Sequence, residues 1–227
     1  MGGLDVVPKK ENRGIDKGPV LYTYAKDVPD PKLGEKVFYI VGHSWVDGMG
    51  HAEQKSSGLG KKLKEKDANI KIIFIGKIGS SAKWAGEQIK ELEGRGLMNP
   101  EQCAGVAIVT GTNDLYAGRN LESTAKTIKE TQEIISSHGI PVFVFNTPCH
   151  KNDKEISEKA VRLNKKIEEK GVLGIINLHS FTEKKGYDGK HPPTKGYSEI
   201  ADELLLKEAI LPSLKYSNLK KNLLLQW

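Results

Sequence analysis

Five apolar runs alternate with helix-patterned segments over the central part of the chain. The runs are rich in Val, Ile and Phe, and they cover 37–42, 70–75, 104–110, 141–145 and 173–178. Near-continuous apolar character of this length is typical of strands that are buried on both faces. Segments with a helical repeat follow them, over 53–66, 82–94, 121–138, 154–170 and 195–209. This alternation predicts right-handed crossovers and a five-stranded parallel sheet between two helical layers.

The segments that flank this alternation have a different character. Residues 1–35 are rich in Gly, Pro, Lys and Asp and contain one short strand-like run, Val20–Tyr24, so we expect an irregular N-terminal arm. Residues 213–227 mix Lys with Leu and are too short and too weakly amphipathic to indicate membrane contact. The prediction is one domain over 36–212, with an arm and a tail that pack on it or mediate a homo-oligomer or larger assembly.

Charge does not indicate a nucleic-acid partner. The 227 residues carry a net charge of +6, with 28% charged and 37% hydrophobic residues. The lysines are mixed with glutamates along helical stretches such as 61–66 and 165–170, which favours solvated helix faces. Aromatic residues are not interleaved with the basic ones, as a stacking platform for bases would require. Nucleic acid is therefore not an expected partner.

The sequence also lacks the patterns of membrane insertion, secretion and metal binding. No basic-then-apolar signal begins the chain, and no stretch approaches the roughly 18 apolar residues of a membrane span. We expect a protein that is cytoplasmic, released by lysis or carried in a virion. Cys103 and Cys149 are far apart and are expected to be free thiols. No metal site is expected, because the histidines share no ligand spacing.

Candidate chemical residues follow the first three strands at their carboxyl ends, where ligands bind in parallel sheets. Ser44 follows a glycine that permits a sharp turn. Gly79 begins a helix, where a backbone N–H suits an anion. Asn113 can donate to an anion through its amide, and Asp114 is expected to hold the loop through backbone N–H groups. Each residue alone also has an ordinary explanation as a turn or cap.

Asp188 and His191 come after the fifth strand and complete a candidate nucleophilic site. Their spacing lets the carboxylate accept from one ring nitrogen while the other nitrogen faces a serine hydroxyl. A nucleophile needs such a base and an orienting carboxylate, and the developing oxyanion needs donors. Trp45 and His150 are weaker candidates for substrate contact, and core packing explains Trp45 about as well.

In this order and at these strand ends, the motifs resemble the SGNH (or GDSL) hydrolase family over about residues 36–209. The resemblance rests on five residues: Ser44, Gly79, Asn113, Asp188 and His191. Thr147-Pro148 and Gly196-Tyr197 are further matches. It implies a flavodoxin-like three-layer α/β/α fold and ester hydrolysis without a metal or organic cofactor. One departure is His43, which stands where the family usually has Asp before the nucleophile.

The resemblance also implies roles for these residues. Ser44, His191 and Asp188 would form a catalytic triad. The N–H groups of Ser44 and Gly79, with the side chain of Asn113, would form the oxyanion hole.

Two hypotheses for function follow. The first is a serine esterase for short acyl esters, such as O-acetyl groups on carbohydrates, because the loops are polar and rich in lysine whereas long-chain lipases need apolar lids. The alternative is a catalytically weak or inactive module that binds glycan or has a structural role in a larger assembly such as a phage particle. His43, the arm and the tail favour this alternative. Flavin or nucleotide binding is disfavoured, because no Gly-rich phosphate loop with a lysine is present.

Overall fold

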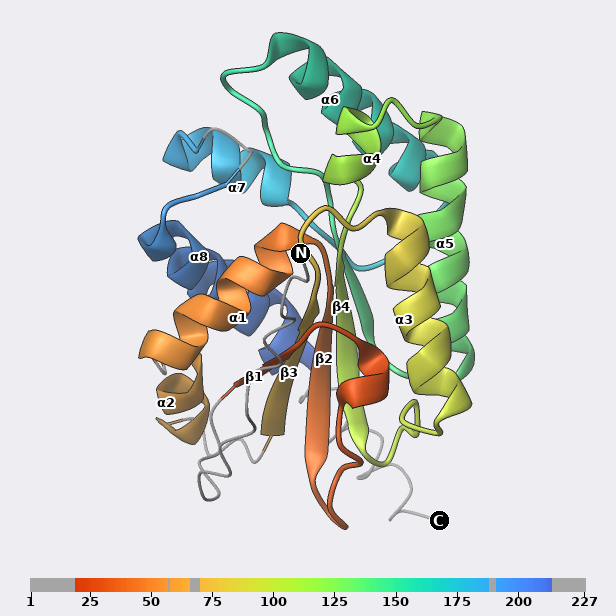
Figure 1. Ribbon diagram of the computed structural model, residues 1–227, viewed down its shortest axis with the longest axis vertical. Coiled ribbons are helices and arrows are strands. Elements are labelled where there is room, and N and C mark those ends of the chain that lie inside the picture. The colour runs from red at the N-terminus through yellow and green to blue at the C-terminus, as the bar shows by residue number, and fades with distance from the viewer. Residues whose placement is uncertain (1–18, 57, 66–69, 188–190, 214–227) are drawn as a thin grey trace, which may run out of the picture.

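The computed structural model describes residues 19–56, 58–65, 70–187 and 191–213, and it has the predicted α/β architecture (Figure 1). All strand pairs in its sheet are parallel, and the strand order is β1-β3-β2-β4-β5-β6. The strands are β1 (Val20–Tyr22), β2 (Lys36–Gly42), β3 (Ile70–Gly76), β4 (Cys103–Val109), β5 (Val142–Phe145) and β6 (Ile175–Ile176).

The five predicted strands are all present as β2 to β6, and a sixth strand is added by the N-terminal arm. Residues 20–22 of β1 pair with residues 73–75 of β3, at the edge of the sheet. The run Val20–Tyr24 is strand-like in sequence, but so short a run within a segment rich in Gly and Pro does not indicate which strand it pairs with, so the sequence alone assigns it to the irregular arm. The added strand covers backbone groups of β3 that would otherwise form an open edge.

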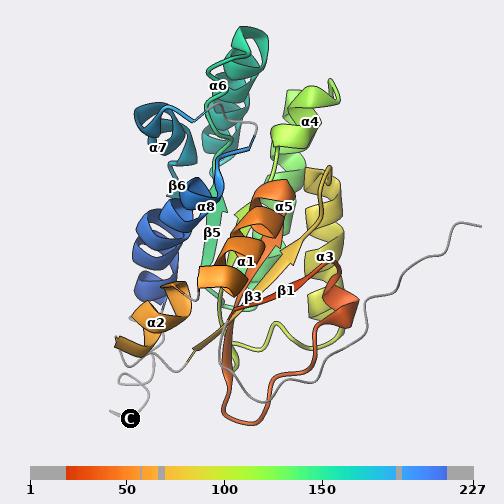
Figure 2. The same ribbon diagram turned by 60° about the vertical axis from the view of Figure 1, so that its left-hand side comes forward.

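The helices cover both faces of the sheet (Figures 1 and 2). They are α1 (Ser44–Ser56), α2 (Gly58–Glu65), α3 (Ala82–Gly94), α4 (Thr112–Tyr116), α5 (Leu121–Ser137), α6 (Lys154–Glu169), α7 (Leu178–Lys185) and α8 (Thr194–Ile200), with a 3-10 turn η1 (Ala25–Asp27) and a π-helix η2 (Ala201–Ile210) that continues α8.

Two hydrophobic cores lie on opposite faces of the sheet. Side chains alternate along β2, so that Val37, Tyr39 and Val41 pack with α3, α5 and α6 on one face. Phe38 and Ile40 pack with α1, α2, α8 and η2 on the other face. The sheet is therefore buried on both sides, as its near-continuous apolar strands predict.

Helix α1 begins at Ser44, nine residues before the helix predicted for this region, and a break separates it from α2. Gly48 and Gly50 lower the intrinsic helix propensity of this segment. Both glycines are places of close packing, because a Cβ at Gly48 would lie 2.4 Å from the ring of Tyr197 and one at Gly50 would lie 2.9 Å from Leu21. Tertiary packing therefore outweighs propensity here, and it places Ser44 in the first turn of a helix.

Helices α4 and α7 were not predicted, because they have only five and eight residues. Helix α4 follows Gly111, whose φ of +104° lies in a region that favours glycine. Helix α7 is capped by the side chain of Asn177, which accepts a hydrogen bond from the N–H of Ser180.

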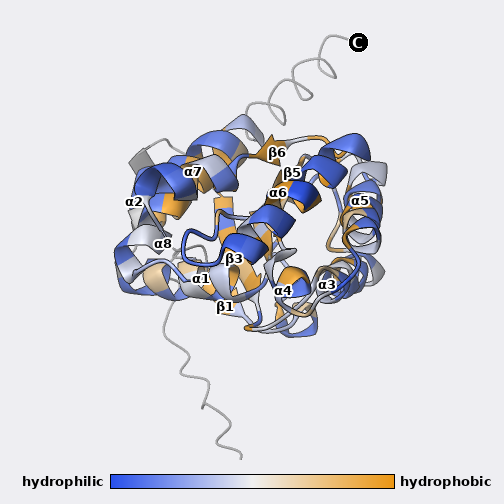
Figure 3. Ribbon diagram, turned by 90° about the horizontal axis from the view of Figure 1, so that it is seen from above, coloured by the Kyte–Doolittle hydropathy of each residue, from blue (hydrophilic) through white to orange (hydrophobic). Residues whose placement is uncertain are grey.

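The order of the strands creates a switch point at the carboxyl edge of the sheet. The chain passes from β2 to β3 on one side and then returns to β4 on the other side of β2. In sheets of this kind, ligands bind where the strand order reverses. Figure 3 looks onto this edge and shows hydrophobic strands enclosed by helices that are largely hydrophilic. The candidate residues after β2 and β4 flank this switch point.

Candidate active site

Ser44 is held at the switch point by the junction of β2 with α1. The carbonyl of His43 accepts hydrogen bonds from the N–H groups of Val46 and Asp47, so the helix starts at once after the strand. A Cβ at Gly42 would lie 2.0 Å from the carbonyl oxygen of Val109, and only glycine fits this approach. The first N–H groups of a helix have no partner within it and lie at the positive end of the helix dipole. Ser44 thus combines a hydroxyl with a backbone N–H suited to an anion.

His191 lies next to Ser44, although 147 residues separate them in the chain. Its Nε2 is 3.1 Å from the Oγ of Ser44, a distance at which a hydroxyl donates a hydrogen bond to a neutral imidazole. Pro193 follows in extended conformation, and α8 begins at the next residue, Thr194. Asp188, the expected orienting carboxylate, lies outside the described residues.

Asn113 and Gly79 lie on two adjoining segments that hydrogen bonds tie together. The Nδ2 of Asn113 donates to the carbonyl of Ser80 over 2.8 Å. Asp114 Oδ2 accepts from the N–H of Ala82 over 2.8 Å, in keeping with its expected role in holding the loop. Gly79 is exposed with a φ of +74°, and a Cβ there would meet open space, so glycine is favoured for its backbone conformation.

Asp114 is buried, and its burial changes the pKa of its carboxyl group. Burial raises the pKa of its carboxyl above the usual value, while the N–H of Ala82 and the charge of Arg119 act in the opposite direction. The Nε of Arg119 lies 3.6 Å from Oδ1 of Asp114. The side chain of Asp114 therefore fixes α4 against the start of α3, and a contact with Ala82, 32 residues away, cannot be predicted from the sequence.

His43 is a buried, neutral histidine directly behind the nucleophile. It is 1% exposed, and its Nδ1 accepts from the N–H of Trp45 over 3.3 Å. Burial, and then the proximity of His191 and His150, lower the pKa of His43 to about 3. Its ring is thus uncharged across the physiological pH range.

This lowered pKa predicts that acid destabilises the fold. The unfolded histidine protonates near 6.5 and the folded one only near 3, so the unfolded state binds more protons between these values and stability falls with falling pH. At about 1.4 kcal/mol per pH unit, acidification to pH 5 should cost about 2 kcal/mol of unfolding free energy through His43. Urea unfolding at pH 7 and pH 5 measures this loss.

The matched variant is His43→Asn, whose amide oxygen can still cap the helix but does not titrate. It should lose about 2 kcal/mol less than the wild type over the same pH interval. Equal losses in the two proteins would contradict the prediction.

The two weaker candidates for substrate contact are buried. Trp45 is 0% exposed and packs edge-to-face on Tyr197 of α8, with 6.2 Å between ring centroids. His150 is also 0% exposed, and its Nδ1 lies 3.2 Å from the hydroxyl of Tyr116. Trp45 therefore belongs to the core rather than to the surface of the site, because α1 turns it inward between sheet and α8. His150 is close enough to His43 to lower the pKa of that residue.

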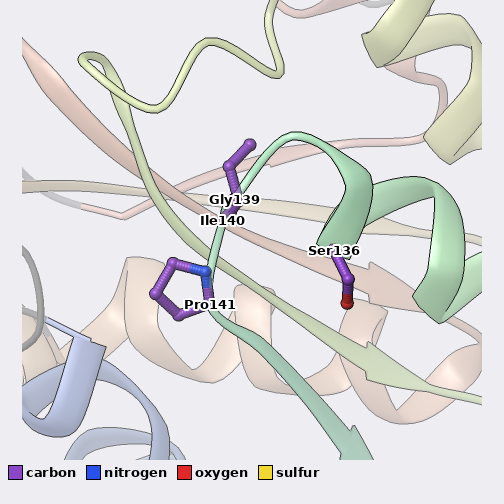
Figure 4. Close-up of a pocket in the computed structure, with 4 residues that line it drawn as sticks. All are labelled: Ser136, Gly139, Ile140 and Pro141. Carbon is purple, nitrogen blue, oxygen red and sulfur yellow. The ribbon is translucent and has the colours of Figure 1, made fainter.

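Two hollows on the surface are formed by residues other than Ser44 and His191. One, of about 260 Å³, is formed by Ser136, Gly139, Ile140 and Pro141 between the end of α5 and the start of β5, at the opposite edge of the sheet (Figure 4). The other, of about 300 Å³, lies between α3, α4 and the start of α5 and includes Asp114 and Arg119. Neither is lined by Ser44 or His191.

Two other features are absent from the described residues. Within these ranges, no group of three or more His, Cys, Asp or Glu side chains is arranged to hold a metal ion. The same part of the chain contains no helix that could span a lipid bilayer.

The fold matches solved structures of lipases and esterases. A GDSL-like lipase from Bacteroides thetaiotaomicron has a TM-score of 0.63 and 19% identity, with 83% of this chain and 94% of that chain covered. The psychrotrophic esterase EstA from Pseudoalteromonas sp. has a TM-score of 0.57 and 16% identity, with 80% and 97% covered. The acetyl xylan esterase AlAXEase has a TM-score of 0.56 and 15% identity, with 73% and 96% covered.

These matches confirm, at the level of structure, the resemblance to the GDSL (SGNH) hydrolases that the motifs indicate. Comparison of the sequence with protein-family models and with curated proteins finds no match. At 15–19% identity, the structural likeness shows the fold alone. The chain therefore has the α/β/α fold of the GDSL lipases and acylhydrolases, with a six-stranded parallel sheet.

Proposed function

We propose that the protein is a serine ester hydrolase with Ser44 as nucleophile and His191 as base. The observation that carries this proposal is the 3.1 Å distance between His191 Nε2 and Ser44 Oγ, which suits proton transfer. Ser44 Oγ attacks the ester carbonyl while His191 takes its proton, and His191 then gives that proton to the departing alcohol. Water cleaves the acyl-enzyme by the same route and restores Ser44.

The oxyanion formed in each step is assigned to three N–H donors. A primary amide has two N–H bonds, and Asn113 uses one to reach the carbonyl of Ser80. Its other N–H, with the backbone N–H groups of Ser44 and Gly79, supplies the hydrogen bonds to the oxyanion. Donors fixed in advance stabilise the developing charge without reorganisation. Asp188 is assigned the role of holding the His191 tautomer.

For the substrate, we propose a short acyl ester, such as an O-acetyl group on a carbohydrate. Within the described ranges, the large apolar side chains exposed on the segments that carry the site are Ile78 and Tyr116. A long acyl chain would need a more extended apolar surface to leave water. The solved acetyl xylan esterase is named for an acetylated carbohydrate and has the same fold.

The test is a series of p-nitrophenyl esters from acetate to palmitate, followed by acetate release from acetylated xylan. We expect kcat/KM to be highest for acetate and to fall with chain length, because little apolar surface is available to bind the added methylenes. A steady rise of kcat/KM with chain length would contradict the short-acyl proposal. Spontaneous hydrolysis in buffer is the baseline for each ester.

Labelling by a fluorophosphonate distinguishes the enzyme from a binding or structural module. The related fold of EstA has been solved in a form inhibited by monoethylphosphonate, so this chemistry suits the fold. An activated Ser44 should be labelled, because His191 removes its proton during attack on phosphorus. Well-folded protein in which Ser44 remains unlabelled, and which turns over no ester, would favour the glycan-binding or structural alternative.

A further inference from the structure

His43 caps the helix that carries the nucleophile. Its carbonyl accepts from the N–H groups of Val46 and Asp47, and its Nδ1 accepts from the N–H of Trp45. A side chain that accepts from the second residue of a helix satisfies one of the unpaired donors there. The ring therefore fixes the first turn of α1, and with it the hydroxyl and backbone N–H of Ser44.

The ring carries out this task without charge. Because Nδ1 accepts a hydrogen bond, the proton of the neutral imidazole is on Nε2. Nε2 is buried and has no acceptor among the residues that the structure describes. The titratable groups that face it are His191, before α8, and His150, after β5. Asp188, expected beside His191, lies outside the described ranges.

Carboxylates on α1 and α4 lie beside groups other than His43, and no carboxylate of the described residues is among the groups that affect the pKa of His43. Asp47, one turn further along α1, lies 3.8 Å from Nε2 of His51. Asp114 of α4 accepts from the N–H of Ala82 and faces Arg119. Among these described groups, none supplies a negative charge that would hold a proton on both nitrogens of the buried ring.

We propose that His43 is an uncharged helix cap that keeps negative charge away from the Ser44–His191 pair and so lets the enzyme work at lower pH. This inference rests on the proposed esterase function. A carboxylate at this position would cap the helix at least as well. It would also favour protonated His191, which cannot accept the proton of Ser44. His43 is thus a positioning residue that also sets the acid limit of activity.

The test compares His43→Asp with His43→Asn, which have nearly the same shape and both cap a helix. We expect the midpoint of the acidic limb of kcat/KM to rise by about 1 pH unit in His43→Asp, because an added negative charge stabilises imidazolium. In His43→Asn the midpoint should stay at the wild-type value, whatever its maximal rate. Equal midpoints in the two variants would overturn the proposal.

A second measurement does not depend on turnover. The C2 proton of His191, followed by NMR against pH, should titrate about 1 pH unit higher in His43→Asp than in His43→Asn or the wild type. If no protein hydrolyses ester but this shift is present, the esterase proposal fails and the electrostatic role of His43 stands. If the esters are hydrolysed but the titrations coincide, the role of His43 fails and the esterase proposal stands.

The wild type and His43→Asn also provide a test should His43→Asp not fold. If His43 is uncharged, the wild type and His43→Asn should have the same midpoint for the acidic limb of kcat/KM. The C2 proton of His43 should also show no titration between pH 5 and pH 8. A different midpoint, or a titration of His43 in this range, would overturn the proposal.

Discussion

Replacing Ser44 with alanine is expected to lower kcat for p-nitrophenyl acetate by roughly 10⁴- to 10⁶-fold. The hydroxyl is the atom that attacks the ester carbonyl, and His191 Nε2, 3.1 Å away, has no other proton to remove in that step. The donors assigned to the oxyanion remain in the variant, so a small residual rate above that of buffer should persist. Initial rates at saturating substrate measure the loss.

Fluorophosphonate labelling gives the same variant a second readout. The wild type should be labelled with one equivalent, and Ser44→Ala should not be labelled at all. Ser123→Ala is the matched control, because Ser123 is an exposed serine in the first turn of α5, and it should keep both labelling and turnover. Retained turnover or retained labelling in Ser44→Ala would remove Ser44 from the mechanism.

Asn113→Ala is expected to lower kcat by roughly 10²- to 10³-fold with a much smaller change in KM. The amide is assigned to the oxyanion, whose full charge exists only near the transition state, so its loss should affect turnover more than ground-state binding. Steady-state kinetics on p-nitrophenyl acetate separates the two parameters. Wild-type kcat in this variant would contradict the assignment.

The same substitution also removes the hydrogen bond from Asn113 Nδ2 to the carbonyl of Ser80, so a control for the loop is needed. Asp114→Asn weakens the neighbouring tie to Ala82 while it leaves the Asn113 amide in place. We expect this control to lower the thermal unfolding midpoint but to lower kcat far less than Asn113→Ala does. Comparable losses of kcat in both variants would indicate that loop position, and not donation to an oxyanion, explains the effect.

The sequence was sufficient for the layered architecture. Apolar runs of Val, Ile and Phe can be buried only if both faces are covered, and the helical segments between them supply that cover. The helix predicted over 82–94 is observed as α3 with these bounds, and its N-cap is Ser81, whose side chain accepts from the N–H of Trp84. The bounds of helix α1 were not predicted, because the packing of Gly48 against Tyr197 cannot be derived from local propensity.

For the candidate site as well, the sequence and the tertiary structure supply different information. The sequence indicates the candidate residues because all strands of a parallel sheet end at the same edge. Residues that follow different strands are therefore expected to lie near one another at that edge. The tertiary structure supplied what a linear pattern lacks: the distance between Ser44 and His191, the tie from Asn113 to Ser80, and the burial of Trp45. The roles of these residues in catalysis stay predictions.

Local sequence determined which segments become strands and helices, and which polar residues follow the strand ends, because those properties depend on repeats and turns within a few residues. Only the tertiary structure decided which of these residues meet. Contact between side chains 147 residues apart depends on the order of strands in the sheet and on glycines at close approaches. The buried, uncharged state of His43 likewise arises from packing by distant segments, which remove water from a ring that would be half charged near pH 6.5 if it were exposed.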